Sequence, residues 1–311
     1  MKKSVFVVIF IAVLLLSACT SSPASQEPTV KVSPLSEIVQ TATNTEAPTL
    51  QPVTVSLELF KNSWIFAPEL KKSVQLTDGK WSETQLDGSR QMVMLDDRFA
   101  IGDLNSDGVE DAVLLVVESM GGSGVFYSVA TFINEGGTFL QKGSAFIDDR
   151  PIVHSIQTIN GEIQLNANVH GLNDPMVDPT VNLTKTYRLI GNRLVTFRQT
   201  QLLADGKVRE INITSPVDFS EASGSTTITG DMPIAPFENT LLVQAFNEKN
   251  TASFTSSIMV NAADAGQPAT FSVNVPLDKF AAGDLVVIQL VEVSMADGSN
   301  MTLDSVILKV K

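Results

Sequence analysis

The sequence predicts a mainly β protein, and two observations carry this prediction. Short runs in which every second residue is apolar recur along most of the chain, as in EIQLNANVH (residues 162–170), and this period is that of a half-buried strand. Turn signals such as Asp78-Gly79 separate the runs, which is typical of hairpins. We therefore expect an N-terminal antiparallel β-rich (α+β) domain over residues 57–200 and a β-sandwich over residues 209–311.

The chain begins with the features of an export signal, residues 1–18. Lys2 and Lys3 precede 12 apolar residues, Val5–Leu16, a run too short to cross a hydrocarbon layer of roughly 30 Å as a helix. The sequence LSAC that ends at Cys19 resembles the lipobox of bacterial lipoproteins, and Cys19 is the only cysteine. The resemblance implies cleavage before Cys19 and a diacylglycerol on its sulfur, which would anchor the chain outside the cytoplasm.

Thr20 follows Cys19. By resemblance to known lipoproteins, a residue other than Asp at this position favours sorting to the outer membrane in a bacterium with two membranes. The expected location is therefore the outer face of the cell membrane or the outer membrane.

Residues 19–56 are interpreted as a tether. Pro, Thr and Ser dominate the segment, and it contains no aromatic residue. Such a segment cannot bury enough apolar surface to offset its chain entropy. We expect an extended spacer that holds the folded part away from the membrane.

Charge and cysteine content exclude several classes of function. The net charge is −13, and it becomes −15 when cleavage of the predicted signal peptide removes Lys2 and Lys3. A surface this acidic argues against nucleic acid and anionic lipid as partners. Without Cys19 the chain has no thiol, and its two histidines leave little material for a Ser-His-Asp or Cys-His site.

The first block, residues 57–200, reads as a succession of strands. Asn160-Gly161 and Gly191-Asn192 mark two further tight turns. Only residues 56–72 have the pattern of a helical segment, which is the α part of the expectation. The predicted strands are DAVLLVVES, GVFYSVATFI, GTFLQKGSAFI, PIVHSIQTI, GEIQLNANVHG, VNLTKTYRLI and RLVTFRQT.

The second block, residues 209–311, contains about seven strand-like runs in roughly 100 residues, a spacing that suits an immunoglobulin-like sandwich. The segments INITSP, TTITG and GDLVVIQLVEVSMADGS resemble the bacterial immunoglobulin-like domain found beside GerMN domains of spore germination. This block has no cysteine pair, so its core would be held by burial alone.

The stretch GDLNSDGVEDAVLLV, residues 102–116, has the spacing of a calcium loop. Ca²⁺ takes six to eight oxygen ligands, and a tight loop can direct alternate side chains to one point. With Asp103 counted as position 1, Gly108 is at position 6 and permits the turn. The alternative is a metal-free turn in which Asp and Asn side chains accept hydrogen bonds from nearby amides. The predicted calcium ligands are Asp103, Asn105, Asp107, the carbonyl of Val109, and Asp111.

The loop differs from an EF-hand, because position 12 is Leu114 and a strand follows. It resembles the calcium loops of FG-GAP repeats, which run into a strand in the same way. Those repeats recur several times in a propeller, whereas this chain carries the motif once. A propeller is therefore excluded. We expect a structural role for the loop, in which a metal ion would pin the turn into residues 111–117, the expected central strand.

A wider resemblance covers residues 95–190. The segments GDLNSDGVEDAVLLV, GGSGVFYSVATFIN, DDRPIVHSI and NVHGLNDPMVDPT, in this order, are similar to a group of uncharacterised bacterial envelope lipoproteins. That group usually carries cysteines before the final Pro of the last motif, where this chain has Val177 and Asp178. The resemblance implies no established activity.

The segment HGLNDPMVDPT offers a candidate ligand loop with His170, Asn173, Asp174 and Asp178. As metal ligands, His170 and the two carboxylates could form a hydrolytic site with an open position. A turn built by Asn173-Asp174-Pro175 explains the same residues. Elsewhere in the chain, Asp148 to Arg150 predict a turn with a local ion pair, from which Asp148 could reach a shared polar site.

The expected function is that of a membrane-anchored binding or scaffolding module with a structural calcium ion and with an envelope protein or a glycan as partner. We expect no enzyme. The alternative is a metal-assisted hydrolase that uses His170, Asp174 and Asp178, and a third reading is a purely architectural envelope component.

Overall fold

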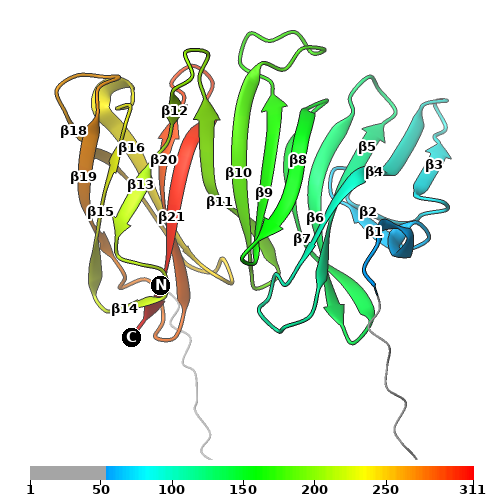
Figure 1. Cartoon of the computed structure of the whole chain (residues 1–311), viewed down its shortest axis with the longest axis horizontal. Coiled ribbons are helices and arrows are strands. Elements are labelled where there is room, and N and C mark those ends of the chain that lie inside the picture. The colour runs from blue at the N-terminus through cyan, green and yellow to red at the C-terminus, as the bar shows by residue number, and fades with distance from the viewer. Residues whose placement is uncertain (1–53) are drawn as a thin grey trace, which may run out of the picture. The chain divides into compact units, whose positions relative to one another are not determined.

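The computed structural model describes residues 54–311, which consist almost entirely of antiparallel strands (Figure 1). The prediction of a mainly β protein is confirmed. The predicted signal peptide, Cys19 and the tether as far as residue 53 lie outside the described residues. Val55, at the end of the predicted tether, is buried in a core cluster, so the folded part begins before residue 57.

The helical part of the prediction is wrong. Within residues 54–311 there is no α-helix, and residues 56–72 contain only one 3-10 turn, η1 (Leu57–Phe60), before strand β1 (Trp64–Ala67). Burial alternates along β1, with Ile65 and Ala67 inside. This period of two is that of a strand, and β1 pairs with β2 (Lys72–Gln75).

A five-stranded antiparallel sheet forms the centre of the first block. Its strand β5 (Asp111–Met120) is the middle strand, and its first eight residues are buried. Val113 and Leu115 belong to the core cluster on one face, whereas Leu114 and Val116 belong to the cluster on the other face, which β1, β2 and η1 cover. The sheet order is β3 (Lys80–Thr84), β4 (Arg90–Gly102), β5, β6 (Phe126–Glu135) and β7 (Thr138–Asp149).

A ten-stranded sheet runs through both predicted blocks. Its first-block strands pack against the five-stranded sheet, and the cluster between them includes Ile163, Leu165 and Tyr187. Along the sheet the order is β8 (Ile152–Ile159), β9 (Glu162–Val169), β10 (Val181–Ile190), β11 (Arg193–Leu202), β21 (Asn300–Val310), β20 (Leu285–Val293), β16 (Thr240–Asn247) and β17 (Ser253–Met259), with β12 (Val208–Arg209) beside β11 and β14 (Ser220–Ala222) parallel to β21.

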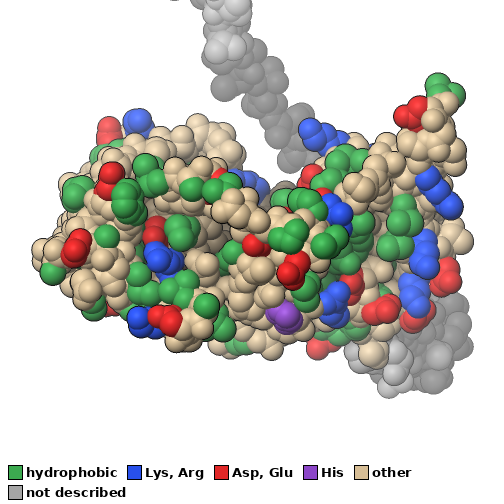
Figure 2. Space-filling model, turned by 90° about the horizontal axis from the view of Figure 1, so that it is seen from above, with side chains coloured by type: hydrophobic (Ala, Val, Ile, Leu, Met, Phe, Trp, Pro, Cys, Tyr) green, Lys and Arg blue, Asp and Glu red, His purple; other side chains and the backbone are tan. Residues whose placement is uncertain are grey.

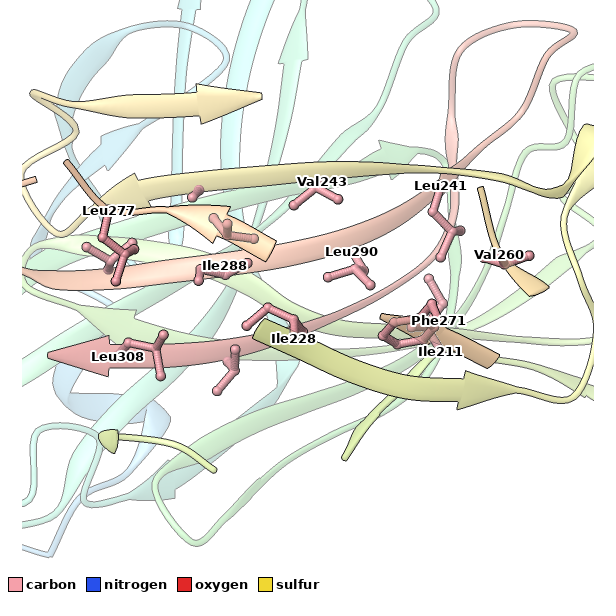
Figure 3. Close-up of a cluster of buried hydrophobic side chains, with 14 of the residues drawn as sticks. Ile211, Ile228, Leu241, Val243, Val260, Phe271, Leu277, Ile288, Leu290 and Leu308 are labelled. Atoms are coloured by element: carbon pink, nitrogen blue, oxygen red, sulfur yellow. The ribbon is translucent and has the colours of Figure 1, made fainter. Parts of the chain in front are cut away.

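A four-stranded sheet closes the second block. Apolar residues of this sheet and of β16, β20 and β21 form a shared core, which Figure 3 shows with Ile228, Phe271, Leu290 and Leu308 among its members. The sheet order is β13 (Asn212–Ser215), β15 (Ser225–Met232), β19 (Ala269–Pro276) and β18 (Asn261–Ala262), and a 3-10 turn, η2 (Phe237–Asn239), precedes β16.

The two blocks are joined through β11 and β21. Gln199 lies opposite Leu303 in this pairing, and the Thr302 hydroxyl donates to the Gln199 carbonyl at 2.6 Å. Arg209 forms an ion pair with the buried carboxylate of Glu292. A small apolar cluster draws on both blocks; its buried members are Ile190, Val195, Phe197, Val287 and Ile307.

Candidate functional site

The acidic loop connects β4 to β5. Its backbone takes positive φ at Ser106 (63°) and Gly108 (83°), conformations that fold the chain back on itself. The loop packs on the β8–β9 turn, where a Cβ on Gly161 would lie 3.1 Å from the Asp103 carbonyl oxygen.

The side chains of the predicted calcium ligands accept hydrogen bonds from the loop's own backbone. Asp103 accepts from the amides of Asp107 (3.1 Å) and Gly108 (2.8 Å), and these amides lower the pKa of Asp103. Asp107 accepts from the Val109 amide at 2.8 Å and from the Asn105 amide group at 2.8 Å. This is the pattern of the turn alternative, and each carboxylate oxygen keeps a further lone pair.

Asp111 is buried and ties the loop to its neighbours. Its carboxylate accepts from the amides of Leu104 (2.8 Å) and Asn134 (2.9 Å). Burial raises the pKa of Asp111 above its usual value despite these bonds. Within residues 54–311, no group of three or more His, Cys, Asp and Glu side chains is arranged to hold a metal ion.

The loop between β9 and β10 is closed by Asp174. This carboxylate accepts from the amides of Gly171 (2.8 Å) and Thr180 (2.7 Å) and from the Thr180 hydroxyl. These bonds lower the pKa of Asp174. Asn173 and Asp178 are exposed, and the structure does not bring Asp174 and Asp178 together with His170 as a cluster of ligands.

His170 instead pairs with Asp148 at the end of β7. Asp148 Oδ2 accepts from the His170 main-chain N–H at 2.6 Å and contacts the ring Nδ1 at 2.8 Å. The ring is therefore held at two points by one carboxylate, and only 12% of the His170 side chain is exposed. Its Nε2 is buried and has no hydrogen-bond partner in the described part of the chain. The predicted ion pair of Asp149 with Arg150 forms at 2.8 Å.

The Asp148–His170 pair lines a cavity of about 450 Å³. Part of the lining is aliphatic, and the turn between β20 and β21 contributes Asp297 and Ser299. The cavity therefore lies where the two blocks meet. The aliphatic lining consists of Ile147, Val169, Leu172, Val181, Leu183, Met301 and Leu303.

Lys185 is the one Lys or Arg among the residues that line this cavity. It lies on β10 opposite Leu165 of β9 and Gln199 of β11, in the row of side chains that continues into the core at Tyr187. Burial lowers the pKa of Lys185, and the charge of Asp148 opposes this effect. In residues 54–311 no carboxylate oxygen lies within 4.0 Å of its Nζ.

Exposed apolar side chains surround the cavity. They lie on the β9–β10 loop, at the end of β11 and on the β20–β21 turn, all at the strand ends onto which Figure 2 looks. Figure 2 shows hydrophobic side chains spread over this face among polar ones. Leu172 is 60% exposed, Val177 83% and Met295 73%.

The acidic loop and the cavity lie at opposite ends of β9. Gly161, beside the acidic loop, precedes the eight-residue strand, and His170 follows it, a separation of about 25 Å at 3.3 Å per residue. An ion in the acidic loop would therefore act on the fold and would not contact a ligand in the cavity.

Lys185 is not among the site residues predicted from the sequence, and Asp148 is predicted only in a turn near a shared polar site. The sequence could have indicated Lys185, because the alternation in VNLTKTYRLI places this lysine on the inward face between Leu183 and Tyr187. Asp148 had no such signal, because it meets His170 across 22 residues of sequence.

Comparisons with known proteins add no further assignment, as no family model matches the chain and no curated protein matches it. Among the helices of residues 54–311, none has the length and apolar character needed to cross a membrane.

Proposed function

We propose that the chain is a lipid-anchored, extracytoplasmic binding module whose ligand occupies the cavity between β10, β11 and the β20–β21 turn. The observation that carries this proposal is the cavity itself, about 450 Å³ with an aliphatic wall and a few converging polar groups. Sites for small molecules have this size and composition. A purely architectural component would not need the Asp148–His170 pair, nor a lysine, Lys185, on the face of β10 that leads into the core.

The test is a screen of small polar compounds by ligand-observed NMR on residues 20–311 and on a variant with the cavity narrowed. Ser299→Trp places a large side chain at the exposed turn that lines the cavity. Ser256→Trp, on the exposed face of β17, is the matched control. Compounds that bind the parent chain and the control, but not Ser299→Trp, support the proposal. Binding that Ser299→Trp leaves unchanged, or no binding at all, contradicts it.

Attachment through Cys19 is supported by the lipobox-like sequence around it. Two or more acyl chains give a stable anchor, since each buried CH₂ contributes about 0.8 kcal/mol. Cys19→Ala should move the protein from the membrane fraction to the soluble fraction, and mass spectrometry of the parent should find a lipidated N-terminal cysteine. A parent protein without lipid would contradict the anchor.

We also propose an immunoglobulin-like fold for residues 209–311, in line with the resemblance to GerMN-associated domains. The strand order supports it: β13-β15-β19-β18 corresponds to A-B-E-D, and β16-β20-β21 corresponds to C-F-G. Such modules commonly display or space other domains, which agrees with a scaffolding role at the envelope.

Calcium in the acidic loop is proposed as a structural ion. Asp103, Asn105, Asp107 and Asp111 carry side-chain oxygen atoms within one short loop, where the Asn105 Nδ2–H donates to Asp107 Oδ2 at 2.8 Å. The Val109 carbonyl would be the fifth ligand. The hydrogen bonds to the amides do not use every lone pair, so the donor set fits a cation that prefers oxygen.

The calcium proposal is tested by thermal unfolding of residues 20–311 in calcium and in chelator. Calcium at 100 times its dissociation constant should stabilise the fold by about 2.7 kcal/mol, which corresponds to a shift of a few degrees. Asp107→Ala should abolish the shift, whereas Asp87→Ala, in a turn elsewhere, should keep it. An unchanged melting temperature would leave the loop as a hydrogen-bonded turn.

A hydrolase is the second candidate, and the fixed Asp148–His170 pair is the observation that favours it. A carboxylate on Nδ1 orients the ring and leaves Nε2 as a base. This candidate differs from the predicted metal-assisted hydrolase, because Asp148 pairs with His170 and Asp174 and Asp178 are not metal ligands in it. His170→Ala should abolish turnover in a hydrolase, but only weaken the affinity of a binding protein.

A further inference from the structure

We propose that the ligand of the cavity is a small organic carboxylate with a short aliphatic body, held by Lys185; this inference rests on the proposed binding function. Lys185 is the only Lys or Arg among the lining residues. Its place on a row of core-facing side chains, opposite Leu165 and Gln199, partly removes its ammonium group from water. A cation in such a place is costly unless an anion or a hydrogen-bond acceptor meets it.

The nearest protein carboxylate is already in use. Asp148 accepts both the main-chain N–H and the ring nitrogen of His170 through the same oxygen, Oδ2. Asp148 is thus paired with His170, and no carboxylate oxygen of the described residues, those of Asp148 included, comes within 4.0 Å of Lys185 Nζ. A carboxylate from the ligand would supply the second acid.

The other acid of the cavity argues for a single negative charge on the ligand. Asp297 lies on the β20–β21 turn, where it accepts from the Ser299 amide (3.2 Å) and hydroxyl (2.9 Å). With Asp148 and Asp297 both at the cavity, a dianion such as a phosphate monoester would meet two negative charges with one lysine. A monoanion bound beside Lys185 would avoid most of this repulsion.

The remaining surface of the cavity determines the body of the ligand. Val181 and Leu183 precede Lys185 on the same face of β10 and line the cavity with it, and Leu303 of β21 lines it as well. No Phe, Tyr or Trp is among the lining residues, and their one aromatic ring is the His170 imidazole, so the cavity offers no large ring for stacking on a flat or sugar ligand. An aliphatic chain of a few carbons would fill this wall.

The test is the affinity of residues 20–311 for hexanoate, hexanol, hexylamine and hexyl phosphate, measured by titration calorimetry. We expect hexanoate to bind at least tenfold more tightly than the other three. Lys185→Met should remove this preference, Lys185→Arg should keep most of it, and Lys309→Met, an exposed lysine of β21, should change the affinity less than twofold.

Lys185→Met also has a readout that does not need a ligand. Replacing a partly desolvated ammonium by an apolar side chain of similar length should raise the melting temperature, so a loss of binding in this variant would not be a loss of folding. Equal binding of hexanoate and hexanol, tighter binding of hexylamine or hexyl phosphate, or hexanoate binding that Lys185→Met leaves unchanged, would overturn the carboxylate while leaving the cavity as a binding site. Failure of every compound in the Ser299→Trp screen would instead remove the proposed function itself.

Discussion

At the scale of single residues, the cavity stands out because some of its buried polar atoms have no hydrogen-bond partner in the described chain. Asp148 holds His170 at two atoms, whereas the His170 Nε2 and the Gln201 Oε1 are buried without a partner in residues 54–311. Buried polar atoms are normally satisfied. Two unsatisfied acceptors beside a partly desolvated lysine therefore mark this place as different from the rest of the core.

The Asp148–His170 contact predicts the tautomer of the ring. A carboxylate at Nδ1 favours the form that carries its proton on Nδ1 and leaves Nε2 unprotonated. Nitrogen-15 NMR of the imidazole at a pH where it is neutral should show this form for His170. In Asp148→Ala the ring should change to the Nε2–H form, whereas His154, which contacts Asn168, should be unaffected. An Nε2–H ring in the parent protein would contradict the pairing.

At the scale of the elements, the contact of β12 with β20 carries a buried charge. Glu292 is 2% exposed, and its one ionic partner in the described chain is Arg209. Burial raises the pKa of Glu292, and Arg209 opposes this rise. Removing one member of a buried pair costs more than the pair itself contributes, because the other charge stays buried.

Arg209→Met should therefore destabilise the fold by about 3–5 kcal/mol at neutral pH. The folded-state pKa of Glu292 lies above its unfolded value and would rise further without Arg209. The stability that its protonated form provides is present at low pH and is lost as the pH rises through the folded-state pKa. The cost of Arg209→Met should thus be largest at pH 8 and smaller at pH 4.5 in urea unfolding.

Two variants control this prediction. Adding Glu292→Gln to Arg209→Met should restore most of the stability at pH 8, because no charge is then left buried. Arg90→Met, which removes an exposed arginine that donates to Ser82, should change stability little and without dependence on pH. A cost for Arg209→Met that is the same at both pH values would contradict the role given to Glu292.

The elements also show what the sequence could predict. Asp78-Gly79 and Asn160-Gly161 take the positive φ values that tight turns need, and the alternation of apolar residues in 162–170 matches the burial of β9. These signals are local, so they can be read along the chain. The pairing of β11 with β21 joins residues 199 and 303, and no local pattern encodes a contact over that distance.

The same limit applies to the candidate site. A histidine in a Pro-rich loop, His170, is conspicuous in the sequence, but its predicted partners Asp174 and Asp178 are its neighbours only along the chain. Asp174 closes its own loop through the amides of Gly171 and Thr180. The actual partner of His170, Asp148, comes from another strand, since only tertiary packing brings the ends of β7 and β9 together.

At the scale of the whole molecule, the described residues, 54–311, all belong to one compact unit. A ten-stranded sheet and an apolar cluster, with Phe197 from one block and Val287 from the other, cross the expected boundary between the blocks. Blocks that share a sheet and a core should unfold together. Because residues of both blocks line it, the cavity would then be as rigid as the joint between them.

Cooperativity can be tested with a core variant in one block and a probe in the other. Both tryptophans, Trp64 and Trp81, lie in the first block, whereas Phe271 lies in the core of the second. Phe271→Ala should cost about 3–5 kcal/mol, and it should lower the urea midpoint seen by tryptophan fluorescence. The exposed Phe237→Ala is the control. An unchanged tryptophan transition in Phe271→Ala would show two independent domains.

The most direct test of the central claim, that a ligand binds where the two blocks meet, is methyl NMR of residues 20–311 during titration with hexanoate. The claim predicts shifts that are largest for the methyl groups of Val181, Leu183 and Leu303, which line the cavity, and absent for Ile228 in the core of the second block. Shifts that gather elsewhere, or that spread evenly over the protein, would contradict it.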